Sequence, residues 1–363
     1  MKFLALIFLF LFPSFLSKTT SDSDFIGYAT AKVTENSTLS ISCFGFADKE
    51  NQTNYDTTTI QNVGSLSKTF IGLSLMIAKD KGLIDLDKNI NEYLDFEVKN
   101  PHFKKGDTFI TLRHLATHTS GIIDNSKIYE TSYSEGKTSK KELGVFLKEY
   151  LSKEGKNFSK KNFNKAKTGM YYTYSNIGSA LAAHILEKAT GISFDQFTKK
   201  NIFEALKMNH SGWSYQQINE QKHAVLYNED DKPLPFYTLI TYPDGGLRTC
   251  ILDLSIYMQE LIKGYNHHSE LLSNEAWDEL YRKNFNEKNT VKNIHPSEPN
   301  TGIFMFYSKK GMIGHTGSDP GASSIFWFDP NTNTGSIFIA NKDITKKNVE
   351  KFKEIWIQLN ASE

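Results

Sequence analysis

Residues 63–70, Val-Gly-Ser-Leu-Ser-Lys-Thr-Phe, set a serine and a lysine three positions apart at the predicted start of a helix. The helix is indicated by an apolar stripe of helical period over residues 66–77 and by Gly82, a residue that favours a helix end. Residues i and i+3 share one face of a helix. We therefore expect the amine of Lys68 to lie within reach of the Ser65 hydroxyl.

The two side chains have the chemistry of a nucleophile and its base. A serine hydroxyl is a poor nucleophile until a base removes its proton, and backbone N–H groups at a helix start can stabilise an oxyanion. Lys68 can act as this base only when neutral, and burial together with the positive end of a helix dipole lowers a lysine pKa. A second Ser-x-x-Lys, residues 134–137, lies in a polar stretch without apolar periodicity. The spacing alone therefore leaves chance as an alternative.

Composition and charge narrow the class of protein. The chain has 363 residues, of which 39% are apolar and 23% charged, which is typical of a globular protein with one large or two interleaved domains. Lysine plus arginine number 42 against 41 aspartate plus glutamate, a net charge of +1. This balance gives no broad basic surface, so we predict no nucleic-acid partner.

Residues 1–18 have the layout of a secretory signal peptide, with a lysine at position 2 and an unbroken apolar run over residues 3–12. The run is short for a bilayer span, and an uncleaved anchor is the alternative. We predict a periplasmic or secreted protein with no stable membrane span after signal removal. Two cysteines, Cys43 and Cys250, do not make a disulfide framework, and a single bridge between them stays open.

Strand patterns lie at both ends of the chain and helical patterns between them. Residues 25–47 alternate as two antiparallel strands joined through residues 35–37, whereas apolar residues over 90–235 fall at helical spacing. Later strands are predicted at 301–307, 312–316, 323–328 and 336–340, and a closing amphipathic helix at 349–359. The predicted fold class is α/β (α+β): a discontinuous sheet domain, residues 25–90 and 240–360, with helices packed on an antiparallel sheet, and a mostly helical domain, residues 91–239.

Further helices are predicted at residues 111–121, 143–151, 177–190 and 252–263. In the first, Thr111 is the expected N-cap and Gly121 the expected stop. His114 and His118 stand four residues apart in it and could form a metal pair. No glutamate lies between them and no third ligand is suggested nearby, so structural roles are favoured and no metal is predicted.

Two other stretches carry side chains suited to the same chemistry. Residues 174–176, Tyr-Ser-Asn, combine a phenol that could relay a proton with an amide that could hold the lysine and a substrate carbonyl. Residues 315–318, His-Thr-Gly-Ser, end a predicted strand, where Gly317 could let a substrate backbone approach. Taken alone, His315 would be interpreted as a surface histidine. A Lys-Thr-Gly at 167–169 lies in a polar loop and is not favoured as a substrate-binding strand.

In this order, the motifs at 65–68, 174–176 and 315–317 resemble those of the serine β-lactamase and penicillin-binding-protein superfamily. The match looks closest to the class C β-lactamase branch and its DD-carboxypeptidase, D-aminopeptidase and esterase relatives. Other stretches similar to that branch are residues 111–121, 244–248 and 314–317, so the resemblance spans about residues 27 to 345. It implies a β-lactamase/transpeptidase-like fold, with the active site between the sheet domain and the helical domain.

The resemblance also implies roles for individual residues. Ser65 would attack a carbonyl carbon to form an acyl-enzyme, and Lys68 and Tyr174 would handle the protons. The backbone N–H groups of Ser65 and Ser318 would form the oxyanion hole. Water would then release the acyl group, so neither a metal nor an organic cofactor is needed.

The resemblance assigns substrate binding to Asn176, His315, Thr316 and Gly317. His315 departs from the lysine of class C β-lactamases, which reduces fixed positive charge and predicts a site that is pH-sensitive near neutrality. We therefore expect a peptidase acting on D-amino-acid peptides or cell-wall fragments. The alternatives are a carboxylesterase, a β-lactamase, and a penicillin-binding sensor module without turnover.

Overall fold

The computed structural model describes residues 24–104, 109–287 and 290–361. The predicted signal peptide, residues 1–18, lies outside these ranges, so its cleavage and the export of the protein stay predictions. Within the described ranges, no helix is both long enough and apolar enough to cross a membrane.

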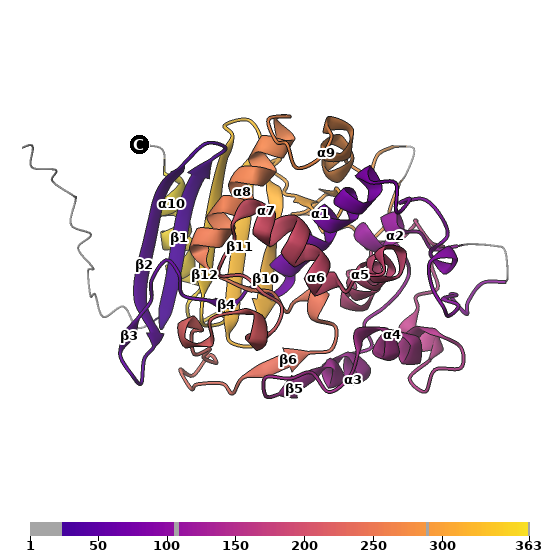
Figure 1. Cartoon of the computed structure of the whole chain (residues 1–363), viewed down its shortest axis with the longest axis horizontal. Helices are drawn as coiled ribbons and strands as arrows, with labels where there is room; N and C mark the ends of the chain where they lie inside the picture. Colours follow the sequence, from indigo (N-terminus) through magenta and orange to yellow (C-terminus); the bar gives the residue numbers. More distant parts are fainter. Residues whose placement is uncertain (1–23, 105–108, 288–289, 362–363) are drawn as a thin grey trace, which may run out of the picture.

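An antiparallel sheet of eight strands forms one side of the molecule, in the order β3-β2-β1-β12-β11-β10-β9-β8 (Figure 1). Strands from the two ends of the chain meet where Ala31 of β1 pairs with Ile337 of β12, so the expected closure of early strands onto late ones is confirmed. The strands are β1 Gly27–Thr34, β2 Thr38–Asp48, β3 Thr53–Asn54, β8 Asn300–Thr301, β9 Phe306–Tyr307, β10 Ile313–Asp319, β11 Ala322–Asp329 and β12 Thr334–Ala340.

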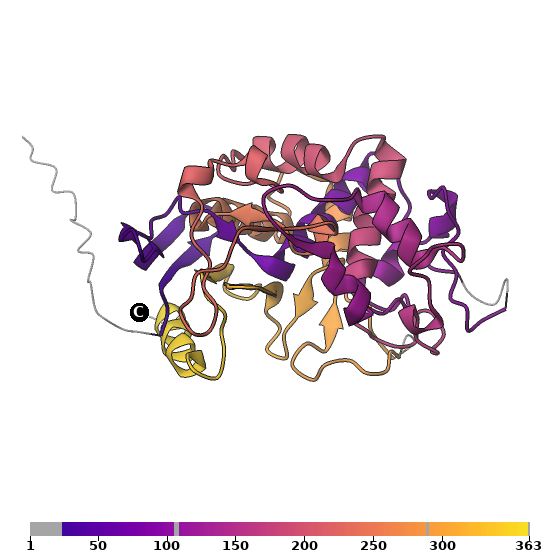
Figure 2. The same ribbon diagram turned by 90° about the horizontal axis from the view of Figure 1, so that it is seen from below.

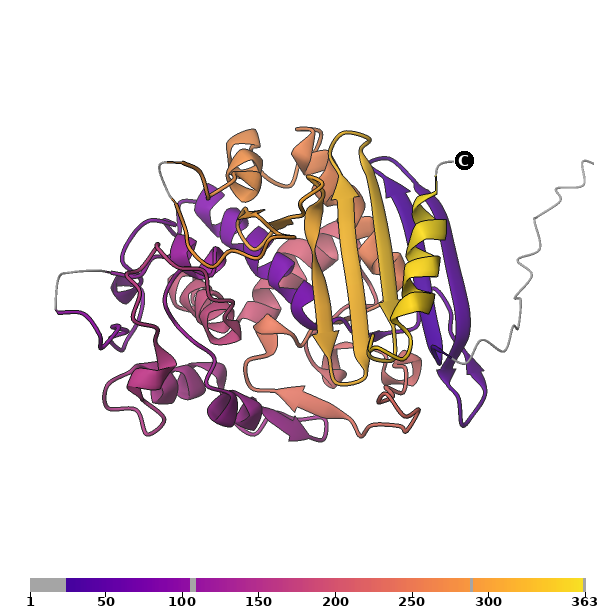
Figure 3. The same cartoon turned by 180° about the vertical axis from the view of Figure 1, so that it is seen from behind.

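Helices cover both faces of this sheet because successive side chains along its strands point alternately into two apolar cores. In β12, Ile337 and Ile339 belong to the main core, whereas Phe338 packs with Ile355 of the last helix. Helix α8, Ile251–Tyr265, lies on the first face and α10, Val349–Asn360, on the second, which Figure 3 shows from behind.

Helix α1, Ser67–Asp80, runs through the centre of the molecule, and every residue from Ser67 to Ala78 is buried. The remaining α-helices of the described residues lie on the side away from α10 (Figure 2). They are α2 Leu112–Ala116, α3 Ser126–Tyr129, α4 Leu143–Leu151, α5 Asn176–Thr190, α6 Phe194–Thr198, α7 Glu204–Leu206 and α9 Asn274–Tyr281. Two short ribbons complete the fold: β4 Gln61–Asn62 with β7 Arg248–Thr249, and β5 Tyr133–Glu135 with β6 Tyr237–Leu239.

Two predicted elements differ in the structure, and one helix was not predicted. The expected strand 301–307 is instead a tight hairpin, because the backbone turns at Phe304 with φ of 54° and Thr301 pairs with Phe306. The expected helix 111–121 ends at Ala116, and His118 adopts φ of 55°, which no helix continues through. Helix α9 was not predicted, although an apolar face at helical spacing was present in its sequence.

Other features are close to expectation. Thr111 caps α2, Gly191 ends α5 in a left-handed conformation, and the hairpin β11–β12 forms as predicted. Cys43 and Cys250 are both free thiols. The boundaries of the sheet domain and the helical domain stay predictions.

Candidate active site

Ser65 lies in a single 3-10 turn, Gly64–Leu66, that leads into α1. The helix itself begins at Ser67, two residues later than the sequence suggested. Lys68 sits in its first turn, and its Nζ donates a hydrogen bond of 2.9 Å to the Ser65 Oγ. The expected proximity of the two side chains is therefore present, with the serine side chain partly exposed.

The amine of Lys68 is enclosed by polar groups from distant segments. Its side chain is fully buried, and Nζ also donates to Asn176 Oδ1 at 2.7 Å and to the Asp244 carbonyl at 2.6 Å. Burial lowers the pKa of Lys68, and the Asp244 carboxyl opposes this shift. A lysine with a lowered pKa reaches its neutral, basic form more readily near pH 7.

Tyr174 covers the same amine, with Lys68 Nζ 5.0 Å from the centre of its ring. The Tyr174 hydroxyl is buried and has no hydrogen-bond partner among the described residues. Burial raises the pKa of Tyr174 well above its usual value, although the nearby Ser65 hydroxyl acts in the opposite direction. The phenol is therefore protonated at neutral pH and can serve as a proton donor.

Asp124 fixes the position of Asn176. The sequence analysis did not identify Asp124. Its carboxylate accepts hydrogen bonds from the backbone N–H of Asn176 at 2.7 Å and of Ile177 at 3.0 Å, and from Ser175 Oγ at 2.9 Å. It thus occupies the N-terminus of α5, where negative charge is favoured. No local pattern could have found Asp124, because it lies 52 residues before Asn176.

His315 is buried, contrary to the surface position that its residue type alone suggested. It is 2% exposed and stacks on Phe306, with ring centres 4.5 Å apart. Burial, together with the charge of Lys68, lowers the pKa of His315 to about 3. The expectation of a site made pH-sensitive near neutrality by His315 is therefore wrong, because this side chain stays neutral throughout that range.

Strand β10 runs directly beside the serine turn, and glycines make this close packing feasible. A Cβ built on Gly317 would lie 2.0 Å from the Val63 carbonyl oxygen. One built on Gly64, which has φ of 53°, would lie 2.8 Å from the backbone nitrogen of Ser318. Gly317 thus makes room for the serine turn, and the approach of a substrate backbone at Gly317 stays a prediction. The consequence is that the Ser318 backbone lies next to the residue preceding Ser65.

Beyond Gly314, the edge of β10 that faces away from β11 pairs with no strand among the described residues. Among the described pairs, β9 contacts β10 only at Ile313 and Gly314. Thr316 and Ser318 are exposed, and the whole motif lies within β10 rather than at its end. An extended peptide could pair along such an edge.

The structure adds two buried carboxylates to which the sequence analysis assigned no role. Asp244 is 1% exposed, and burial raises the pKa of its carboxyl above the usual value. Asp319, at the end of β10, is 5% exposed, and burial raises the pKa of Asp319 to about 6. Both carboxylates act electrostatically on Lys68.

Burial keeps several histidines neutral. The pKa is lowered to about 4 in His114, to about 3 in His223 and His315, and well below its usual value in His118. His114 and His118 do not form a metal pair, since the Nδ1 of each accepts a backbone N–H, from Thr111 and Ser175 respectively. In the described part of the chain, no group of three or more histidine, cysteine or acidic residues could hold a metal ion.

The free energy of unfolding is expected to fall as the pH is lowered from 7 to 4. In each of these buried histidines the pKa is lower in the folded chain than the usual value of about 6.5, so between these two pKa values the unfolded chain binds a proton that the folded chain does not. Each such histidine then lowers the free energy of unfolding by up to about 1.4 kcal/mol for every pH unit. The raised pKa values of Asp244 and Asp319 oppose this trend, because each folded carboxyl binds its proton at a higher pH than in the unfolded chain, but the four histidines outnumber these two carboxyls. Urea unfolding at each pH measures the trend. His223→Gln should flatten it and the exposed His295→Gln should not; an unfolding free energy that stays constant down to pH 4 would contradict the expectation.

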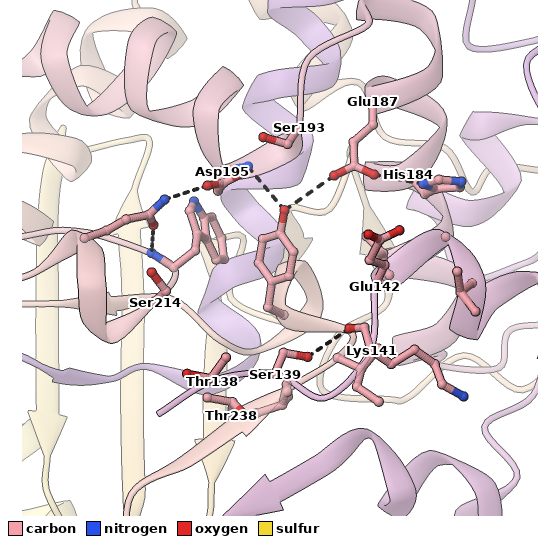
Figure 4. Close-up of a pocket in the computed structure, with 18 of the residues that line it drawn as sticks. Thr138, Ser139, Lys141, Glu142, His184, Glu187, Ser193, Asp195, Ser214 and Thr238 are labelled. Carbon is pink, nitrogen blue, oxygen red and sulfur yellow. Dashed lines mark hydrogen bonds and ion pairs between the residues drawn. The ribbon is translucent and has the colours of Figure 1, made fainter. Parts of the chain in front are cut away.

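A separate cavity of about 940 Å³ does not include Ser65 in its lining. Glu187 and Asp195 line one side and Ser139 and Thr238 the opposite side (Figure 4). Its wall includes Tyr242, from the 3-10 turn Tyr242–Asp244 whose last carbonyl accepts from Lys68. The cavity thus adjoins Lys68 through the 3-10 turn Tyr242–Asp244.

The sequence of this chain is similar to those of several known proteins. The family model described as Beta-lactamase matches residues 14–360. A β-lactamase of Providencia stuartii is 26% identical over 217 residues, covering 60% of this chain and 50% of that protein. Penicillin-binding protein 4* of Bacillus subtilis (strain 168) is 28% identical over 168 residues, covering 46% of this chain and 34% of that protein. The matched region is thus half or less of either relative.

Solved structures support the same fold. A structure titled as a β-lactamase/D-alanine carboxypeptidase from Pseudomonas syringae superposes with a TM-score of 0.70 at 17% identity. The superposition covers 93% of this chain and 95% of that one. At this identity the likeness concerns the fold alone.

Proposed function

This chain belongs to the β-lactamase family of serine hydrolases, and we propose that it hydrolyses peptides containing D-amino acids through an acyl-enzyme on Ser65, in the manner of a DD-carboxypeptidase. The observation that carries the proposal is the 2.9 Å contact between Ser65 Oγ and the buried Lys68 amine. A base at this distance can take the hydroxyl proton as the oxygen attacks.

The proposed reaction uses the groups that surround Ser65. As Ser65 Oγ bonds to the carbonyl carbon, negative charge develops on the carbonyl oxygen, and the backbone N–H groups of Ser65 and Ser318 would stabilise it. Lys68 takes the proton and Tyr174 relays one to the leaving nitrogen as the C–N bond breaks. Asn176, which bonds Lys68, holds the amine in place. Water then attacks the ester and releases the acid.

A peptide substrate is supported by the exposed edge of β10. Backbone groups of residues 315–319 lie beside the serine turn, and an extended peptide could pair with them as an added strand. The proposed D-amino-acid specificity draws on two related proteins, a penicillin-binding protein and a β-lactamase/D-alanine carboxypeptidase. Their names describe those proteins, and a similar specificity is proposed for this chain.

A carboxylesterase is the second candidate, and the neutral state of His315 favours it. A β-lactam or a peptide with a free carboxyl end brings a negative charge, and His315 supplies no positive charge to meet it. An uncharged ester has no such need.

The test incubates the purified chain with a penicillin and with acyl-D-alanyl-D-alanine and acyl-L-alanyl-L-alanine. A mass gain on intact protein with the penicillin, together with faster release of the terminal alanine from the D peptide, is expected. Hydrolysis of p-nitrophenyl acetate without either result would move the assignment to a carboxylesterase. Penicillin consumed without a persistent adduct would indicate a β-lactamase, and a stable adduct without any turnover would indicate a sensor module.

A further inference from the structure

The cavity that Tyr242 borders is large enough to hold a small molecule. Its volume of about 940 Å³ falls within the range of about 300 to 1,000 Å³ that is usual for ligand sites. The cavity lies between helix α4, the end of α5 and strand β6, and Ser65 is not among its lining residues. A ligand bound here would therefore occupy a site separate from the serine centre.

Apolar side chains of this cavity are open to solvent. Val145 of α4 is 46% exposed and Ile192, just after α5, is 42% exposed, and both line the cavity. Leu143, Leu239 and Ile240 are buried and line it as well. Apolar surface inside a concave site commonly receives the apolar body of a ligand. We therefore expect the occupant to have an apolar part.

The lining also contains three carboxylates that pair with no lysine or arginine among the described residues: Glu142, Glu187 and Asp195. Those of Glu142 and Glu187 turn into the cavity (Figure 4). No hydrogen bond to the Glu142 side chain is found in the described part of the chain, and Asp195 uses only Oδ2, which accepts from Gln196 and Gln217. Glu142 and the Oδ1 of Asp195 are therefore available to a ligand.

His184 adds an acceptor to these carboxylates. It is 6% exposed, and its Nδ1 lies 2.8 Å from Glu187 Oε2. Because a carboxylate only accepts hydrogen bonds, Nδ1 carries the proton, and Nε2 of the neutral ring is an acceptor. Nε2 has no hydrogen-bond partner among the described residues, and a Cβ built on Gly144 would lie 2.9 Å from it, so the glycine leaves this nitrogen uncovered. We call Glu142, His184, Glu187 and Asp195 the acceptor wall.

The cations of the lining are engaged with other groups. Three lysines each pair with a carboxylate outside the acceptor wall: Lys137 with Glu220, Lys141 with Glu149 and Lys188 with Asp95. The buried Arg248 donates to backbone carbonyls, and Lys148 forms no described ion pair. Burial raises the pKa of Tyr242 well above its usual value, and the charges of Glu187 and Asp195 raise it further. The unpaired charge of the lining is thus negative, with three carboxylates against Arg248 and Lys148.

We propose that this cavity binds a primary amine with an apolar body, and that the acceptor wall holds its ammonium group. An ammonium ion has three N–H donors and no acceptor, which matches a set of groups that only accept. Hydrogen bonds between charged groups are roughly twice as strong as those between neutral groups. The charge of the ligand should therefore decide its affinity, while Val145 and Ile192 favour an apolar body. The proposal does not depend on the reaction at Ser65.

The test compares probes that share one apolar body and differ in charge: phenylbutylamine, phenylbutanol and phenylbutyrate. Isothermal titration calorimetry measures their binding at about pH 8, where imidazole is neutral and an alkylamine is protonated. We expect the Kd of the amine to be at least about tenfold lower than that of the alcohol, and the butyrate to bind most weakly. Equal Kd values for amine and alcohol, tighter binding of the butyrate, or no binding of the amine would overturn the proposal.

Glu142→Gln tests the acceptor wall. Glu142 is exposed and makes no described side-chain hydrogen bond, so the fold should persist. The variant should raise the Kd of phenylbutylamine at least about threefold and leave that of phenylbutanol within about twofold. Glu135→Gln is the matched control, since it removes the same charge from an exposed carboxylate that does not line the cavity, and it should change neither Kd. An equal rise in Kd for amine and alcohol in Glu142→Gln would contradict recognition of the charge.

Val145→Lys tests the location of the ligand. It adds a positive charge where the apolar body is expected, and the exposure of Val145 allows the fold to persist. We expect it to weaken the binding of phenylbutylamine at least about tenfold, because like charges repel. A Kd of the amine that stays unchanged in both Glu142→Gln and Val145→Lys would place its binding outside this cavity and so refute the proposal.

Discussion

Ser65→Ala is expected to abolish acylation and hydrolysis for every substrate, with a loss of kcat on the order of 10⁴-fold or more. The methyl group cannot form the acyl bond, and no other hydroxyl is described in contact with the Lys68 amine. The fold should persist, because the serine side chain is partly exposed and gives up a single described hydrogen bond. Steady-state hydrolysis of p-nitrophenyl acetate and intact-protein mass after penicillin treatment measure the effect.

Ser134→Ala is the matched control, since Ser134 opens the second Ser-x-x-Lys of the chain. Its hydroxyl pairs with Thr238 and lies away from Lys68. This variant should keep its activity. Activity near the wild-type level in Ser65→Ala, with an adduct still formed, would contradict the nucleophile assignment.

Lys68→Ala is expected to slow acylation by more than about a hundredfold, in line with the loss of a general base. It also leaves Asn176 Oδ1 and the Asp244 carbonyl without their donor, so a lower unfolding temperature is expected as well. Pre-steady-state release of p-nitrophenol isolates the acylation step from the later attack of water.

Lys68→Arg distinguishes a base from a positive charge. The guanidinium keeps the charge but is not deprotonated in proteins, so it cannot accept the serine proton. We expect a loss similar to that of Lys68→Ala. Lys137→Ala, at the partly exposed lysine of the second motif, serves as the control. Acylation by Lys68→Arg within a few-fold of the wild type would mean that another group is the base.

Many regular elements with local patterns were predicted, although α9 was missed despite the apolar face in its sequence. The alternation over residues 25–47 gave β1 and β2, and the apolar face of residues 143–151 gave α4 with the same five side chains buried. Irregular backbone was missed. The turn at Phe304 and the early end of α2 both depend on residues with positive φ that are not glycine, and such conformations carry no sequence signal.

The sequence predicted the motif residues of the candidate site but not the buried carboxylates around them. The motif positions Ser65, Lys68, Asn176 and Ser318 all lie around one centre, and the roles assigned to them await the experiments above. Asp124, Asp244 and Asp319 were not identified, because an aspartate in a loop or at a strand end looks the same in sequence whether it is buried or exposed.

The sequence by itself determined the spacing of Ser65 and Lys68, since one turn of helix brings positions i and i+3 together wherever the helix lies. Only the tertiary structure decided what surrounds the amine: Asn176 and Asp244 reach it from 108 and 176 residues away. It also decided the protonation of the site, because burial lowers the pKa of Lys68 and His315 and raises the pKa of Asp319. Burial depends on packing between distant segments, which no stretch of sequence specifies alone.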